Sequence, residues 1–393
     1  MARPKKGVFH VKWAESGECK IKIADGLFEE GNGIFADAIR EVSGREKPRI
    51  FLVADSNVVQ KTEQLGVKIG RSLSSGGIEM AGTPVMVSGG ERVKSDGFAT
   101  IGKIAKAVFE ARLAPSDVLV AIGGGTVIDA AGFAAASVRG GVKFVIVPTT
   151  IAAAMDSTFM ESARIDAMDV KDAIRIRMRP SAALIDVGFS STVLDGVWRG
   201  GLGALTRYAA ASDAGLMKRI VAAKEELKAR DMEMLSSLLK EAVASCASNG
   251  SPNTGLWAAH RLESMSNFKL PHGYAVPMGV CMDCAYGVKA GILSETDAQT
   301  IRSTLEFFGA FEGFMHSHHI LGRVQSILRG IDTWWLSGDG ALDIPRSIGK
   351  TVKVEFPDRE IYAAVLEELV ADVMNRSQGQ EKTSPVNSAL ISE

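Results

Sequence analysis

Apolar and polar positions along this chain follow two different patterns, and the change falls near residue 186. Before it, short apolar runs alternate with segments of helical spacing. The runs at 49–55, 117–122 and 143–147 end at or just before polar residues or glycine, as buried parallel strands do. The helical segments lie at 94–113 and 128–137. This alternation predicts an α/β unit: a doubly wound parallel sheet with helices on both faces.

After residue 186 the spacing is helical, with no convincing strand. The predicted helices lie at 201–211, 216–228, 232–248, 256–266 and 276–290, with a late amphipathic helix at 358–374. Pro277 suits the first turn of its helix, where a missing N–H costs least. We therefore predict an α/β domain at 1–186, an all-α domain at 187–376 and an unstructured tail at 377–393. A cleft between the two domains is the expected site.

Composition excludes several classes of function. Lys and Arg (45) nearly balance Asp and Glu (46), which argues against a general attraction to nucleic acid or anionic membranes. No apolar run approaches the roughly 18 residues that span a bilayer, and the basic start resembles no secretory signal. Four cysteines fit a reducing cytoplasm, and we favour inert packing over metal or redox chemistry for Cys281 and Cys284. We expect a cytoplasmic homodimer without nucleic-acid or membrane partners.

A glycine loop carries the first candidate chemistry. Gly123, Gly124 and Gly125 follow a predicted strand and open a helix of small residues. Glycine lets the backbone approach a pyrophosphate, whose charge the helix N-terminus stabilises. Other polar residues follow strand ends, where a doubly wound sheet binds its ligand. These residues are Asp55, Asn57, Asp129, Thr149 and Thr150. Together these residues favour a dinucleotide-binding site over the alternative that they only form turns and helix caps.

Three segments of this half resemble 3-dehydroquinate synthase, a sugar phosphate cyclase: 88–95, 123–136 and 147–157. They resemble less closely the iron-dependent alcohol, glycerol and glycerol-1-phosphate dehydrogenases. The synthase pattern runs without a gap from Gly123 to Tyr208, and a second match covers 253–280. The resemblance implies a Rossmann-like NAD-binding domain and a helical metal domain. It also implies that NAD contacts Asp55, Asn57, Glu91, Lys94, Gly124, Gly125, Asp129, Thr149, Thr150 and Asp156.

In the synthase, bound NAD oxidises a hydroxyl of a seven-carbon sugar-acid phosphate, phosphate is eliminated, the ketone is reduced so that NAD is regenerated, and the ring closes. A metal polarises the oxygen of the oxidised carbon. The resemblance places its three ligands at Ala204, Leu256 and His272, and alignment to the dehydrogenases puts Gly203 in place of Ala204. A catalytic divalent metal needs about three protein ligands, and alanine, leucine and glycine side chains donate none. The sequence therefore argues against a catalytic divalent metal.

The substrate positions implied by the resemblance have also changed. Ser162 replaces one lysine and Asp172 replaces an asparagine, whereas Lys171 is retained. Arg207 replaces another lysine, and an arginine can hold a phosphate or carboxylate with two hydrogen bonds. We expect Lys171 and Arg207 to hold a small anionic sugar or polyol between the domains. The site set implied by the resemblance is Lys171, Arg207, Asn253, His260 and His272.

Three further features have two interpretations each. His260 is either an acid–base group or a hydrogen-bonded core histidine. Arg175, Arg177 and Arg179 share one face of a strand, and we favour a solvated edge strand over an anion clamp. The histidines at 316, 318 and 319 lie on one short stretch that cannot direct them to one tetrahedral centre, which argues against a replacement metal site.

Three functions remain open. The first is a diverged synthase-like, NAD-dependent enzyme with an altered substrate. The second is an NAD(P)-dependent dehydrogenase nearer the glycerol-1-phosphate branch. The third is a non-catalytic protein that keeps the fold for binding or assembly. The missing metal ligands argue against both enzymes in their usual metal-dependent form, and the intact glycine loop argues against the non-catalytic protein. The gap-free match from Gly123 to Tyr208 favours the first.

Overall fold

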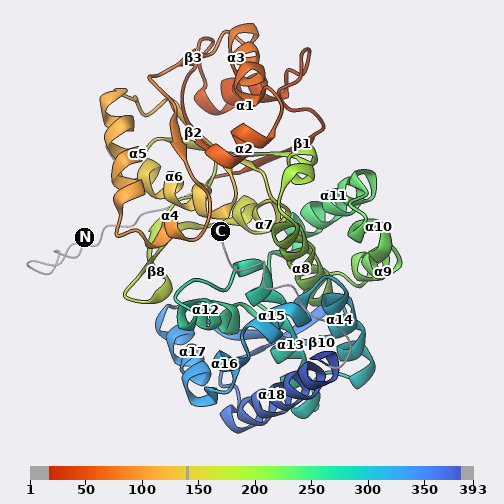
Figure 1. The fold of residues 1–393 in the computed structure, drawn as a ribbon. Helices are drawn as coiled ribbons and strands as arrows, with labels where there is room; N and C mark the ends of the chain where they lie inside the picture. Colours follow the sequence, from red (N-terminus) through yellow and green to blue (C-terminus); the bar gives the residue numbers. More distant parts are fainter. Residues whose placement is uncertain (1–16, 139–140, 382–393) are drawn as a thin grey trace, which may run out of the picture.

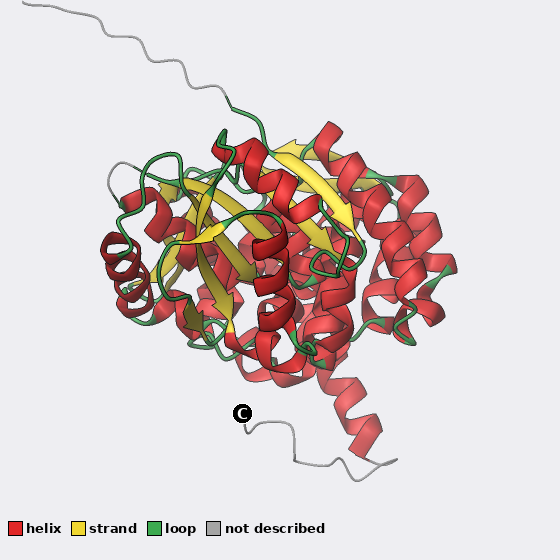
Figure 2. Cartoon of the chain, turned by 90° about the horizontal axis from the view of Figure 1, so that it is seen from above, coloured by secondary structure: helices red, strands yellow, loops and turns green. Residues whose placement is uncertain are grey.

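The computed structural model describes residues 17–138 and 141–381. The N-terminal half is a parallel sheet flanked by helices, and the C-terminal half is helical apart from one hairpin (Figures 1 and 2). The predicted fold class is therefore confirmed. No helix in the described residues is both long and apolar enough to cross a membrane.

Seven parallel strands form the main sheet, in the order β1-β9-β6-β5-β2-β3, with β4 also paired to β2. They are β1 (Lys20–Ala24), β2 (Arg49–Asp55), β3 (Glu79–Met80), β4 (Val85–Val87), β5 (Val118–Gly123), β6 (Lys143–Pro148) and β9 (Ala182–Asp186). The predictions for β2, β5 and β6 are confirmed. Gly123 is in register with Pro148, and Ala54 with Ile122, so the loops after these three strands meet at one edge of the sheet.

Alternation along the strands supplies an apolar layer on each face of the sheet. Ile50 and Leu52 pack with α1 (Ile34–Ser43) and α3 (Leu65–Ser75), whereas Phe51 and Val53 pack with α5 and α6. These helices are α5 (Ala99–Glu110) and α6 (Gly125–Ser137). The predicted helix 94–113 is divided into α4 (Arg92–Ser95) and α5, because Gly97 and Phe98 adopt positive φ angles of 66° and 73°.

Short helices follow two of the central strands. They are α2 (Ser56–Lys61) after β2, and α7 (Ile151–Asp156) after β6. An antiparallel hairpin of β7 (Ser162–Ala167) and β8 (Val170–Arg177) lies between β6 and β9 in the sequence and packs on α6 and the helical half. This hairpin carries Lys171 and Asp172 toward the other half of the molecule.

The helical half contains eleven helices among the described residues. They are α8 (Asp195–Ser212), α9 (Ala214–Ala222), α10 (Lys224–Lys228), α11 (Met232–Asn249), α12 (Leu256–Met265), α13 (His272–Lys289), α14 (Glu295–Phe307), α15 (Ala310–His316), α16 (His318–Leu321), α17 (Val324–Leu336) and α18 (Arg359–Glu381). The helix α18 extends five residues past 376, and residues 382–393 of the predicted tail lie outside the described residues.

Two predictions for this half are wrong. A hairpin of β10 (Leu342–Ser347) and β11 (Lys350–Val354) lies where no strand was expected. In the sequence, only Leu342 and Ile344 flank a polar residue before Pro345, an alternation too short to be recognised, and all four of these residues are buried. Pro277 is not in a first turn, because α13 begins at His272. Its ring packs against Gly203, whose Cβ, if it had one, would lie 2.5 Å from Pro277 Cγ.

Glycine contacts set the positions of α8, α12 and α13. An ideal Cβ on Gly200 would lie 2.4 Å from Gly273 Cα, so α8 and α13 touch through their backbones. An ideal Cβ on Gly279 would lie 2.0 Å from the Gly255 carbonyl oxygen at the start of α12. On α13, Cys281 and Cys284 are buried free thiols, as expected for inert packing. These three helices carry Ala204, His260 and His272.

Candidate functional site: a dinucleotide edge beside a buried ion network

The N-terminus of α6 is open. Gly124 is its N-cap residue, and no side chain caps the first backbone N–H groups. An ideal Cβ on Gly124 would meet only Thr150, at 3.5 Å. The Thr149 hydroxyl is buried and has no hydrogen-bond partner in the described part of the chain. Uncapped N–H groups, an unused hydroxyl and free space above glycine fit a pyrophosphate.

Asp55 organises the neighbouring loops of this edge. Its carboxylate accepts hydrogen bonds from the backbone N–H of Asn57 at 2.9 Å and of Gly89 at 3.3 Å. An ideal Cβ on Gly89 would lie 2.2 Å from Asp55 Oδ2, so the loop after β4 needs glycine here. Six of the predicted cofactor residues thus lie at or beside one sheet edge. They are Asp55, Asn57, Gly124, Gly125, Thr149 and Thr150.

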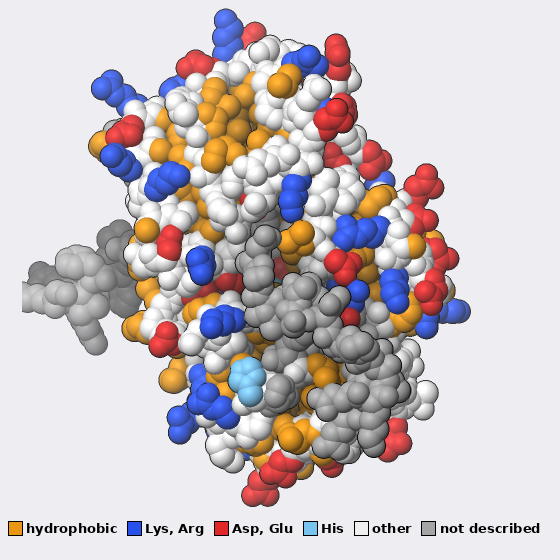
Figure 3. Space-filling view, in the orientation of Figure 1, with side chains coloured by type: hydrophobic (Ala, Val, Ile, Leu, Met, Phe, Trp, Pro, Cys, Tyr) orange, Lys and Arg blue, Asp and Glu red, His pale blue; other side chains and the backbone are white. Residues whose placement is uncertain are grey.

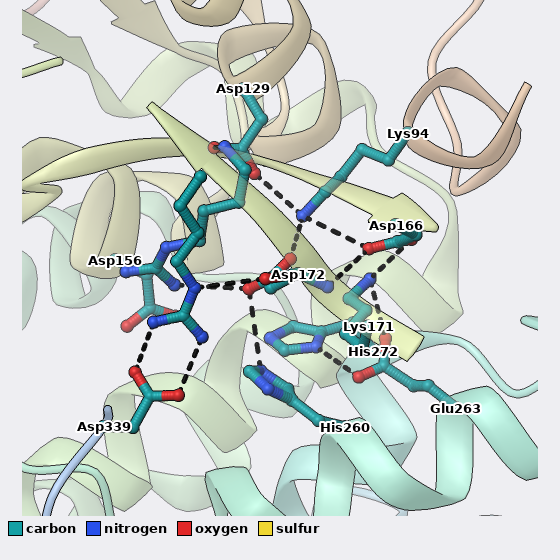
Figure 4. A network of polar contacts seen from close by, with 12 residues as sticks. Lys94, Asp129, Asp156, Asp166, Lys171, Asp172, His260, Glu263, His272 and Asp339 are labelled. Atoms are coloured by element: carbon teal, nitrogen blue, oxygen red, sulfur yellow. Dashed lines mark hydrogen bonds and ion pairs between the residues drawn. The ribbon is translucent and has the colours of Figure 1, made fainter. Parts of the chain in front are cut away.

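Of the other predicted cofactor residues, Lys94 and Asp129 belong to a buried network of charges (Figure 4), and Glu91 joins it through Lys171. Lys94 is buried, and its Nζ lies 3.0 Å from Asp129, 2.5 Å from Asp172 and 3.9 Å from Asp166. Burial acts against its charge, but Asp129 and Asp172 outweigh that effect and raise the pKa of Lys94. Lys94 therefore remains charged and is bound by side chains of the protein.

Lys171 lies at the centre of this network and joins the two halves. Its Nζ forms ion pairs with Glu91 and, at 3.2 Å, with Glu263 of α12, while Asp166 lies 3.7 Å away. Burial disfavours the ammonium, but Glu263 and Glu91 raise the pKa of Lys171 well above its ordinary value. Its backbone N–H donates to Ser264 Oγ of α12 at 3.1 Å. The ammonium is thus neutralised within the protein.

His260 and His272 flank Glu263, with ring centroids 6.3 Å apart. Glu263 Oε2 lies 3.1 Å from His272 Nδ1. Burial acts to raise the pKa of Glu263, but Lys171 and His272 lower it to about 2. Burial lowers the pKa of His260 to about 4, although Asp172 lies 4.0 Å away. Despite burial, Glu263 raises the pKa of His272. His260 is therefore a neutral base near pH 7.

Sequence reasoning missed Glu263, although its position carried a signal. It lies three residues after His260 on α12, a spacing that places both side chains on one helix face. Glu263 has no exposed surface, and a carboxylate in such a place requires cationic partners. Lys171 and His272 are those partners.

Arg207 and Asn253 serve the packing of the helical half. The buried Arg207 guanidinium lies 2.5 Å from Asp156 and donates to the Pro252 carbonyl. The Asn253 side chain bonds to the backbone of Ala341 and Asp343, which holds β10 in place. Lys171 and Arg207 thus each pair with carboxylates of the protein, and their joint binding of one anion stays a prediction. Asp156, a predicted cofactor residue, is the partner of Arg207.

The residues at the positions of the family's metal ligands do not fit a catalytic metal. Ala204 is buried in α8, and Leu256 packs against the apolar core. His272 supplies one nitrogen, and that residue bonds Glu263. No group of three or more His, Cys, Asp or Glu in the described residues could hold a metal ion. The side chains at 316 and 318 lie outside the described ones.

The three arginines of the β7–β8 region do not form one clamp. Arg175 is partly buried and binds both carboxylate oxygens of Asp339, one of them at 2.7 Å. Arg179, beyond the end of β8, pairs with Glu161 on the surface at 2.6 Å. Arg177 is exposed. The predicted solvent-exposed basic strand edge therefore holds for Arg177 and Arg179. Arg175 instead links the two halves of the molecule.

These features define a Rossmann-like domain joined to a helical domain, with a polar site between them. Models of 3-dehydroquinate synthase match the chain twice: the N-terminal model at 84–198 and the C-terminal model at 251–320. The 3-dehydroquinate synthase of Cereibacter sphaeroides is 24% identical over 370 residues, 90% of this chain and 96% of that protein. That of Halorhodospira halophila is 27% identical over 312 residues, 76% of this chain and 83% of that protein.

Solved structures share the fold. A 2-epi-5-epi-valiolone synthase from Streptomyces hygroscopicus, with NAD+ and Zn2+ bound, gives a TM-score of 0.78 at 19% identity, covering 93% of this chain and all of that chain. An NADH-dependent butanol dehydrogenase from Thermotoga maritima gives a TM-score of 0.66 at 16% identity, and the match covers 91% of this chain and 98% of that chain. The chain thus resembles the 3-dehydroquinate synthases in sequence over two separate segments, and it shares its fold with a sugar phosphate cyclase-type synthase and with an alcohol dehydrogenase.

Proposed function

We propose that this protein is an NAD-dependent, synthase-like enzyme that acts on a small anionic sugar or polyol derivative without a catalytic divalent metal. The open N-terminus of α6, with Gly124 and the unpaired Thr149 hydroxyl, is the observation that carries the proposal. When bound, NAD supplies a hydride acceptor. The family's NAD-bound relatives support the cofactor, and the residues at the ligand positions argue against the metal.

The chain's own residues have distinct tasks in this proposal. The N–H groups of the first turn of α6 bind the pyrophosphate, since helix N-termini favour anions. His260 accepts a proton from a substrate hydroxyl, because its lowered pKa leaves it neutral near pH 7. Lys171 and His272 lie on either side of Glu263 and place positive charge near that proton transfer.

One observation favours the non-catalytic alternative. Lys94, Lys171 and Arg207 are each neutralised by carboxylates of the protein, so none is free to bind a substrate phosphate as expected. A non-catalytic member would bind NAD without turnover. The iron-type dehydrogenases share the fold and define a third alternative, in which a simple alcohol is oxidised and NADH accumulates.

Calorimetric titration with NAD tests the proposal. Gly124→Val should abolish NAD binding, since its branched side chain would fill the space above the α6 N-terminus. The folded chain tolerates the change, because Gly124 has an extended backbone (φ −74°, ψ 176°) and a Cβ there makes only an ordinary contact. Gly102→Val, at an exposed position of α5 with open space, is the matched control and should bind NAD normally. Failure of the parent chain to bind NAD(H) or NADP(H) at millimolar concentration would refute the proposal.

A further inference from the structure

Trp334 of α17 differs from the other buried tryptophans of the described residues. It is 6% exposed, and its indole Nε1 is buried without a hydrogen-bond partner within that part of the chain. Trp198 Nε1, by contrast, donates to the Leu227 carbonyl at 3.0 Å, and Trp257 Nε1 donates to Asp283 at 2.9 Å. A buried N–H group without an acceptor destabilises a folded protein, and buried indoles normally have one. For Trp334 we therefore expect the acceptor to belong to a bound molecule.

Trp334 and His260 line one cavity, which lies between the β7–β8 hairpin and the contact of α12 with α17 and is called the His260 cavity below. The two rings have centroids 5.7 Å apart and planes inclined by 52°. The helices are in close contact here, since an ideal Cβ on Gly330, one turn before Trp334, would lie 2.7 Å from Arg261 Cβ. This packing holds the indole beside the proposed base.

The charges around the His260 cavity do not favour an anion. Arg175 pairs with Asp339. Lys171 pairs with two further carboxylates, Glu91 and Glu263. On the face shown in Figure 3, acidic and basic side chains are mixed where the two halves of Figure 1 meet. Carboxylates thus outnumber cations around the cavity, which favours an uncharged group inside it. The charged residues of its lining are Lys171, Arg175, Arg261, Asp169 and Asp339.

Size and hydrogen-bonding capacity select the group that fits. The cavity has a volume of about 20 Å³, the space of about one water molecule, and a phosphate with its four oxygens is larger. A hydroxyl both donates and accepts. It can accept from Trp334 Nε1 while it donates to His260, which burial keeps neutral near pH 7. The oxygens of a carboxylate or an ionised phosphate only accept, so they leave the acceptor nitrogen of His260 unused.

We propose that Trp334 is a substrate-binding residue whose indole N–H donates a hydrogen bond to a substrate hydroxyl inside the His260 cavity. This inference deepens the proposed function and rests on it, because the same hydroxyl supplies the proton that His260 accepts. The uncharged, hydroxylated end of the ligand binds in the cavity, and the anionic group stays outside. Trp334 thereby selects a polyol over a ligand that carries no hydroxyl at this end.

Proton–nitrogen NMR of the chain labelled at its tryptophan nitrogens tests the contact, because five tryptophans give five indole signals. The signal that Trp334→Phe removes belongs to Trp334. Glycerol, the uncharged probe, should shift this signal saturably in the presence of NAD and leave the other four in place. Inorganic phosphate should not shift it. The other four signals also show whether the Trp334→Phe chain is folded.

The affinity for glycerol, measured by saturation-transfer NMR, tests the N–H group itself. Trp334→Phe keeps an aromatic ring beside His260 and removes the donor, so the affinity should fall roughly threefold to tenfold, as for one hydrogen bond between uncharged groups. Trp335→Phe is the matched control, because Trp335 is 41% exposed and stacks on Phe356 with ring centroids 5.1 Å apart. This variant should change the affinity less than twofold.

Three results would overturn the inference. They are a Trp334 signal that glycerol does not shift, a shift caused by phosphate instead, and unchanged glycerol affinity in a folded Trp334→Phe chain. NAD titration of the same samples is independent. Normal NAD binding without a glycerol effect refutes this inference alone, whereas a glycerol-dependent shift in a chain that does not bind NAD refutes the proposed function.

Discussion

Lys171 illustrates how its neighbours decide what a cationic residue can do. The sequence identifies a lysine at a substrate position of the family, but Glu91, Asp166 and Glu263 surround its ammonium in the folded chain. These carboxylates come from the loop after β4, from β7 and from α12, far apart in sequence. The sequence therefore predicted a lysine at this position but not that its charge is neutralised, because neutralisation depends on contacts between segments far apart in the sequence.

His260 gives a pH-dependent prediction. Its pKa is 6.5 in an ordinary setting and about 4 in the folded chain. Between these values the unfolded chain binds a proton that the folded chain does not. The free energy of unfolding therefore falls as the pH drops from about 6.5 to about 4, and this loss should be shallower in His260→Gln. Urea denaturation at several pH values in this range measures the slope.

Asp283 acts in the opposite direction, since burial raises its pKa from 3.8 to about 6 and the folded chain gains stability as the pH falls through that range. Asp283 is intact in both His260→Gln and the parent chain, so its contribution cancels in the comparison. Equal slopes for His260→Gln and the parent chain would show that His260 is not neutral in the folded state.

At the scale of elements, the sequence predicts what depends on local spacing. The strands β2, β5 and β6, and the glycine loop between β5 and α6, were predicted because buried parallel strands are short apolar runs. The break at Gly97, the start of α13 at His272 and the β10–β11 hairpin were missed. Their causes are positive φ angles, packing of Pro277 on Gly203, and tertiary contacts of two short strands, none of which produces a periodic signal.

The crossing of α12 and α13 yields a prediction at this scale. Gly279→Ala should lower the free energy of unfolding by about 1–3 kcal/mol or more, because its Cβ would collide with the Gly255 backbone. Gly70→Ala is the matched control, since that helical glycine of α3 has open space around it and should be neutral or slightly stabilising. Urea denaturation compares the two. A Gly279→Ala chain as stable as Gly70→Ala would contradict the close crossing.

Across the whole molecule, ion pairs connect the sheet half to the helical half. Lys171 of β8 contacts Glu263 of α12, and Arg175 of the same strand contacts Asp339 just after α17. The hairpin β7–β8 therefore holds both halves around the His260 cavity.

The Arg175–Asp339 pair should contribute measurably to stability. Asp339→Asn should lower the free energy of unfolding by about 1–2 kcal/mol, because it leaves a partly buried guanidinium without its charged partner. Asp332→Asn, which breaks an exposed pair with Arg359, is the matched control and should cost under about 1 kcal/mol. Denaturant unfolding distinguishes the two. Equal losses would mean that the link between the halves is no stronger than a surface pair.

The central claim is that this synthase-like chain binds NAD through the open end of α6 without any catalytic metal in the cleft. Calorimetric titration of NAD into chelator-treated protein, before and after adding zinc, tests it most directly. We predict one NAD per chain with the same dissociation constant in both cases, since Ala204 and Leu256 offer no ligand atoms. Absence of binding, or binding that requires or is strongly tightened by stoichiometric zinc, would contradict the account.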